Sequence, residues 1–82
     1  MNLEIGTVVK SLNGRDKNKY FCVVDIEGEY VLYCNGCARR LEKPKRKKIK
    51  HVQVTQAKLQ TETLQVNKHL YKALKSLHLE EE

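Results

Sequence analysis

The sequence predicts a mainly β protein: a small barrel of about five short strands, followed by a C-terminal α-helix. Residues 5–54 form short apolar runs separated by turn-forming pairs such as Asn13-Gly14, which is an all-β pattern. After Thr55 the apolar residues recur at helical spacing instead. Five short strands in about fifty residues are typical of a small barrel.

The first two predicted strands flank Asn13-Gly14. The first spans Ile5–Lys10, and the second, Tyr20–Ile26, carries apolar residues on both faces, as a central strand does. We expect the next two, 30–34 and 37–41, to form a hairpin around Asn35-Gly36. An Asn-Gly pair suits a two-residue turn because both positions need positive φ.

The stretch Glu42–Lys48 is too charged to pack in a core, and Pro44 lacks a backbone donor. We therefore interpret it as a projecting or edge segment. In residues 49–54, Lys50, Val52 and Val54 alternate with the other side chains, which predicts a short, partly buried strand that closes the barrel.

An amphipathic helix is predicted over residues 67–78, with Asn67 as its N-cap. Its polar side carries Lys68, Lys72 and Lys75. Glu80, Glu81 and Glu82 follow, where the helix dipole disfavours anions, so we expect the tail to fray. The predicted division is a barrel of residues 1–54, then a linker and helix over residues 55–82 that pack on or beside it.

Positive charge is concentrated in one segment. The formal net charge is +6, but Arg39–Lys50 holds eight Lys or Arg and one Glu, a net +7, so the other residues sum to −1. Such a cluster is the electrostatic footprint expected for a polyanion. The alternative is a solvated polar face. Membrane binding is disfavoured because no hydrophobic anchor accompanies the cluster.

A second basic stretch surrounds Gly14, which lets the backbone come close to phosphate. Its alternative is an ordinary turn in which Asp16 neutralises a neighbour. Tyr20, Tyr30 and Tyr33 could stack bases, but in a chain with one Phe and no Trp we favour most of them as core residues.

Metal binding and catalysis are both disfavoured. Cys34 and Cys37 have the spacing of half a zinc site, with Cys22 and His51 as conceivable further ligands, but no second such pair is present. With 82 residues, folding hides only about 60% of the unfolded surface, which leaves little room for a substrate cavity. We expect reduced thiols, no cofactor and no enzymatic activity. Since no secretory signal or bilayer-long apolar run is present, we expect a cytosolic protein.

Residues 6–26, GTVVKSLNGRDKNKYFCVVDI, resemble the KOW motif of RNA-binding ribosomal and transcription proteins. The matching positions are Gly6, Val8, Val9, Ser11, Gly14, Arg15, Asp16 and Phe21. Residues 30–51 are similar to a bacterial KOW group related to a large-subunit ribosomal protein of archaea and eukaryotes. Many members have glycine where this chain has Asn18, which tolerates left-handed geometry. Cys34 and Cys37 are not part of the pattern.

The resemblance implies an SH3-like barrel whose Gly14 loop and basic segment approach an RNA backbone. We therefore expect a module for ribosomal or ribosome-associated RNA, monomeric when free, with ribosomal or transcription proteins as possible neighbours. The alternative is a protein-interaction module that contacts an acidic translation or transcription factor. The predicted RNA-binding residues are Gly14, Arg15, Lys17, Lys19, Arg39, Arg40, Lys43, Lys45, Arg46, Lys47, Lys48 and Lys50.

Overall fold

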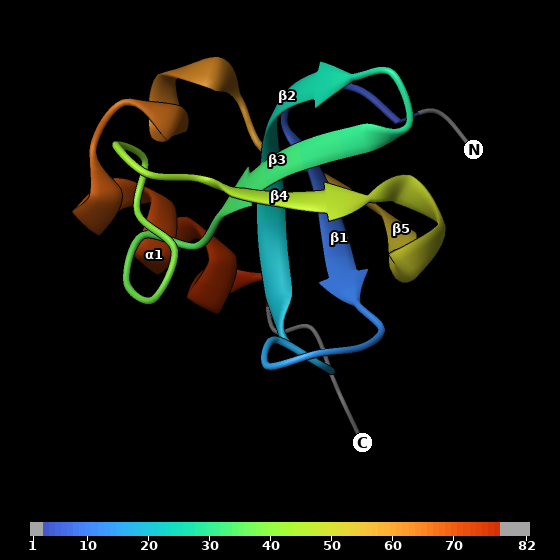
Figure 1. The fold of residues 1–82 in the computed structure, drawn as a ribbon. Helices are drawn as coiled ribbons and strands as arrows, with labels where there is room; N and C mark the ends of the chain where they lie inside the picture. The colour runs from blue at the N-terminus through green and yellow to red at the C-terminus, as the bar shows by residue number, and fades with distance from the viewer. Residues whose placement is uncertain (1–2, 78–82) are drawn as a thin grey trace.

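The computed structural model describes residues 3–77, which form a five-stranded antiparallel sheet with one α-helix beside it (Figure 1). The mainly β fold and its C-terminal helix are confirmed. The elements are β1 (Thr7–Ser11), β2 (Tyr20–Glu27), β3 (Tyr30–Cys34), β4 (Lys45–Lys48), a 3-10 turn (Ile49–His51), β5 (Val52–Lys58), a second 3-10 turn (Thr61–Leu64) and α1 (Asn67–Ser76).

The strand order is β4-β3-β2-β1-β5. Strands β1 to β4 therefore lie in sequence order, and β5 crosses over to pair with β1. Because β4 and β5 lie at opposite edges, the sheet formed by the described residues is not closed. The ladder from β1 to β5 contains a register shift between Thr7 and Val9, and β2 to β3 contains one between Val23 and Asp25. Such irregularities increase the local twist of a sheet.

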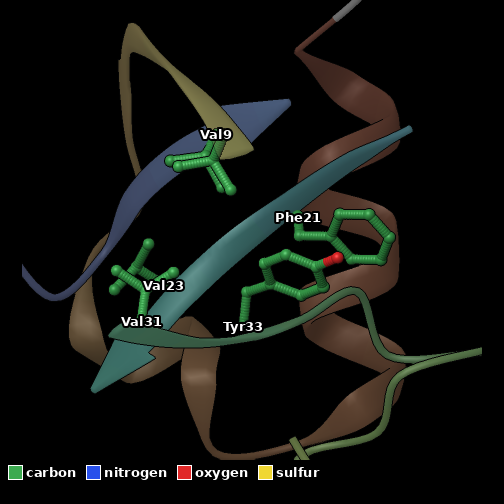
Figure 2. Packing of buried hydrophobic residues seen from close by; sticks show 6 residues of the cluster. Val9, Phe21, Val23, Val31 and Tyr33 are labelled. Carbon is green, nitrogen blue, oxygen red and sulfur yellow. The ribbon is translucent and has the colours of Figure 1, made fainter. Parts of the chain in front are cut away.

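The central strands are buried on both faces, because successive side chains point to opposite sides of the sheet. One cluster contains Val9, Phe21, Val23, Val31, Tyr33 and Val52. In it the rings of Phe21 and Tyr33 stack with their centroids 4.1 Å apart (Figure 2), so Tyr33 fills the core as expected. The other cluster contains Val8, Cys22, Cys34, Leu59 and Leu70, the last contributed by α1.

The predicted hairpin around Asn35-Gly36 is wrong, and residues 37–41 form no strand. The Asn35 side chain accepts hydrogen bonds from the backbone N–H groups of Cys37 (3.1 Å) and Arg39 (2.9 Å). The N–H groups of Asn35 and Gly36 in turn donate to the Arg39 carbonyl. These bonds close a compact loop, because an Asn side chain can replace the ladder as the partner of nearby backbone groups.

The strand that pairs with β3 lies inside the basic segment instead. Tyr30 is opposite Lys48, and Tyr33 is opposite Lys45. Lys45 and Lys47 are half-buried while Arg46 and Lys48 are exposed, so every second stem covers the core and its charged end reaches water. The expectation of an edge segment is thus confirmed for residues 45–48, and charged residues are common on edge strands.

Further boundaries of β5 and α1 differ from the predictions. The strand expected from residue 49 begins at Val52, because Ile49–His51 form a 3-10 turn, and it continues to Lys58, beyond its predicted end at residue 54. Asn67 does not cap α1: Val66 is the N-cap, and the Asn67 side chain bonds to the loop before β4. The helix ends at Ser76, and the predicted end of the helix and the acidic tail at 78–82 lie outside the described residues.

Within residues 3–77, no helix is long and apolar enough to cross a membrane.

The three thiols should differ sharply in reactivity. Cys22 and Cys34 are buried, and burial raises the pKa of Cys22 to about 12 and that of Cys34 to about 11. Cys37 is exposed. Because the thiolate is the reactive form, 5,5′-dithiobis(2-nitrobenzoate) at about pH 8 should label Cys37 rapidly and the other two only after unfolding. In Cys37→Ser the rapid phase should vanish; its persistence would contradict the burial of Cys22 and Cys34.

Candidate nucleic-acid interface

The loop between β1 and β2 is shaped by two residues with positive φ, Gly14 at +76° and Asn18 at +69°. Asn18 therefore adopts the left-handed geometry that glycine favours, as expected for its place in the loop. Its N–H donates to the Ser11 carbonyl over 2.8 Å, and the Lys17 N–H donates to Gly14 over 3.2 Å. The loop presents Arg15, Lys17 and Lys19 as exposed side chains.

Asp16, by contrast, turns inward and is 5% exposed. Its carboxylate accepts a hydrogen bond from the Tyr33 hydroxyl (2.8 Å) and two from Arg39, through Nε (3.0 Å) and Nη2 (3.3 Å). Burial alone would raise the pKa of Asp16. The bonds from Arg39 and Tyr33, with the charges of Arg39 and Lys47, outweigh burial and hold this pKa below its usual range.

Lys47 joins the two basic stretches that the sequence suggested separately. Its Nζ donates to the carbonyl of Asn13 over 3.0 Å, beside Gly14. Together with the Asp16–Arg39 pair, this contact holds the Gly14 loop against β4 and the loop that precedes it. The predicted glycine loop therefore lies beside the side of the basic segment that carries Lys45 and Lys47.

An open depression of about 660 Å³ lies along the basic segment. Its lining is Ala38, Arg39, Arg40, Glu42, Lys43, Pro44, Lys45 and Arg46. Arg40 pairs with Glu42 over 3.1 Å, and both side chains are more than half exposed, so this pair contributes little and can open cheaply. Lys48 and Lys50 lie apart from this depression and border a second one, with Gly28, Glu29 and Ile49.

The predicted cations are thus of two kinds. Arg39, Arg40 and Arg46 pair with carboxylates, and Lys47 is bonded to a carbonyl. The remaining cations form no side-chain ion pair or hydrogen bond within the described part of the chain. They are Arg15, Lys17, Lys19, Lys43, Lys45, Lys48 and Lys50. The free positive charge of the surface is therefore carried mainly by lysines.

Helix α1 anchors the loop before β4, a role that no pattern in the sequence indicated. The Asn67 side chain accepts the Leu41 N–H over 2.7 Å and donates to Glu42 over 2.8 Å. Gly36, with φ +85°, packs so closely that an added Cβ would clash with the Asn67 carbonyl. The loop that carries Arg39, Arg40 and Lys43 is therefore held from the helix side as well.

Among residues 3–77, no group of three or more His, Cys, Asp or Glu side chains is placed to hold a metal ion. Cys34 donates its S–H to the Arg40 carbonyl over 3.3 Å and lies in the core, whereas Cys37 faces solvent.

The sequence matches no protein-family model and no curated protein.

Replacing the buried carboxylate tests the Asp16 network. Asp16→Asn should lower the free energy of unfolding by about 2 kcal/mol, because it removes hydrogen bonds made to a charged acceptor. Urea denaturation measures this loss. The matched control is Glu27→Gln, which breaks the exposed pair with Arg46 and should cost less than about 1 kcal/mol. Equal losses would show that the buried pair contributes no more than a surface one.

The same network predicts the acid response. Since the pKa of Asp16 is lowered by folding, its contribution is complete above the ordinary aspartate pKa and is lost as the pH falls through the lowered one. The stability of the wild type should therefore fall below about pH 4 more steeply than that of Asp16→Asn. Parallel curves of stability against pH would contradict the lowered pKa.

Removing the Asn67 side chain should loosen the basic loop. Losing two hydrogen bonds, each worth about 1 kcal/mol, should let trypsin cut after Arg39 or Arg40 about five-fold faster or more. Mass spectrometry identifies the cut sites. The exposed neighbour His69 serves as control, since His69→Ala should leave the cleavage rate unchanged. An unchanged rate in Asn67→Ala would show that the loop does not depend on the helix.

Proposed function

We propose that this protein is a non-catalytic RNA-binding module that holds the phosphate backbone of a structured RNA, with ribosomal RNA as the favoured target. The observation that carries the proposal is the contact between Lys47 and Asn13, which places the Gly14 loop beside the basic segment. Both stretches can then contact the same polyanion.

The kind of charge favours backbone contacts over the reading of bases. Lysine is a flexible point charge, suited to phosphate at varied geometry. The lysines without a partner in the described chain include Lys43 in the loop before β4 and Lys45 and Lys48 in β4 itself. Phosphate contacts position a protein on nucleic acid but carry no sequence information. RNA helices are recognised mostly through their shape and backbone.

The rigid backbone that carries the basic residues also favours RNA binding. β4 is paired to β3 along its length, and the loops on either side of the surface are tied by the Asp16–Arg39 pair and by Asn67. A preorganised surface loses less conformational entropy when it binds.

The proposal includes the KOW-type, SH3-like barrel and, with it, a cytosolic and monomeric protein. Three features support this class: the strand, glycine turn and strand of β1 and β2, the bulged ladder from β1 to β5, and the left-handed Asn18. The resemblance implies that the Gly14 loop and the basic segment approach RNA, and here that loop lies beside Lys47 of the basic segment.

A charge-matched pair of triple variants tests the function. Lys43, Lys45 and Lys48 form no pair within the described chain, so their replacement by Gln should remove RNA contacts without breaking the fold. In titrations of ribosomal RNA at about 50 and 200 mM salt, affinity at low salt should fall about ten-fold or more. The slope of log affinity against log salt should fall by about 0.7–0.9 for each phosphate that the variant no longer neutralises.

The control is the triple replacement of Lys68, Lys72 and Lys75 by Gln on the exposed side of α1, which removes the same charge. It should change the affinity and the salt slope little. Equal losses in both variants would mean that net charge alone acts, and no binding at low salt would overturn the proposal. Tighter binding of polyglutamate than of RNA would instead favour an acidic protein partner.

A further inference from the structure

Arg46 and Tyr30 form a stacked pair on the face of the sheet opposite to the Tyr33 cluster. The guanidinium carbon lies 3.7 Å from the centroid of the tyrosine ring. Tyr30 is opposite Lys48, and Leu32 is opposite Arg46, so all four side chains project from the same face. The Arg46 guanidinium therefore lies over a ring that projects from β3.

The charge of Arg46 is already offset. Glu27 approaches Nε of Arg46 to 3.7 Å, and the two side chains are 58% and 51% exposed. One face of the guanidinium thus covers Tyr30 and its edge meets a carboxylate, while more than half of the side chain remains open to solvent. A phosphate here would meet the negative charge of Glu27, whereas a neutral planar group would not.

A nucleobase is the planar group that fits this surface. Unpaired bases stack on aromatic rings and on arginine planes. Lys48, exposed and next to Tyr30 across the ladder, has no partner in the described chain and can take the phosphate of the same nucleotide. We propose that Arg46 and Tyr30 are a stacking platform for an unpaired RNA base, with Lys48 holding its phosphate.

This inference rests on the proposed function, and it narrows the class of RNA that the protein would bind. Side chains of β4 alternate between two faces: Lys45 and Lys47 lie on the side of the Gly14 loop, and Arg46 and Lys48 lie on the platform side. An RNA that engages both sides passes around the edge of the sheet. The substrate class is therefore a helix with an unpaired nucleotide beside it, such as a bulge or an overhang.

Two RNA hairpins with one stem test the platform, one blunt and one with a short overhang that contains 2-aminopurine. The wild type should bind the overhang hairpin about five-fold tighter or more, the lower end expected for one stacked base. Stacking should also quench the 2-aminopurine fluorescence. Arg46→Lys keeps the charge but lacks the plane, so it should lose both the preference for the overhang hairpin and the quenching.

Tyr30→Leu, which keeps an apolar side chain, should have the same effect as Arg46→Lys. Tyr71→Leu is the matched control, because Tyr71 is an exposed tyrosine with Lys75 over its ring at 5.4 Å, and it should change nothing. Equal affinity of the wild type for both hairpins, or a preference that survives Arg46→Lys, would overturn the platform but leave backbone binding intact. Failure to bind either hairpin would overturn the proposed function itself.

Discussion

The buried carboxylate of Asp16 is the constraint on which the rest of the surface depends. It accepts hydrogen bonds from the Tyr33 hydroxyl and from the Arg39 guanidinium at once. The Gly14 loop, the core cluster that contains Tyr33 and the basic segment are therefore all connected through the Asp16 carboxylate. A buried charge is tolerated only when it is paired and hydrogen-bonded, which makes both partners necessary. One positive charge of the basic segment is therefore structural, and the charge open to a ligand belongs chiefly to lysines.

The central part of the fold could be predicted because its signals are local. Apolar residues on both faces of residues 20–26 indicated a central strand, and the spacing of Leu70, Leu74 and Leu77 indicated the helix. The hairpin at Asn35-Gly36 failed because the Asn35 side chain captures nearby N–H groups, which the dipeptide itself cannot reveal. β4 was missed as a strand because its sequence is Lys-Arg-Lys-Lys, and only long stems over the core make such a strand stable.

The location of the candidate site could be predicted by counting charges. The hydrogen bonds and ion pairs that hold its residues in place could not. The roles of Arg39, Lys47 and Asn67 depend on partners far away in sequence: Asp16, Asn13 and Leu41. No local pattern marks such residues. Asp16 stands among cations in a turn, where neutralising a neighbour is the simplest interpretation, and its burial becomes evident only once β3 brings Tyr33 beside it.

The charged edge strand also bears on how copies of this protein behave toward one another. An open edge is a template for intermolecular strand pairing and, in a protein with a thin core, for aggregation. In β4, four consecutive cations oppose the approach of a second β4, so electrostatic repulsion protects this edge. A polyanion that neutralises these charges removes the repulsion and must cover the edge in its place. Under the proposed function, polyanion binding and protection against strand pairing would therefore depend on the same four residues.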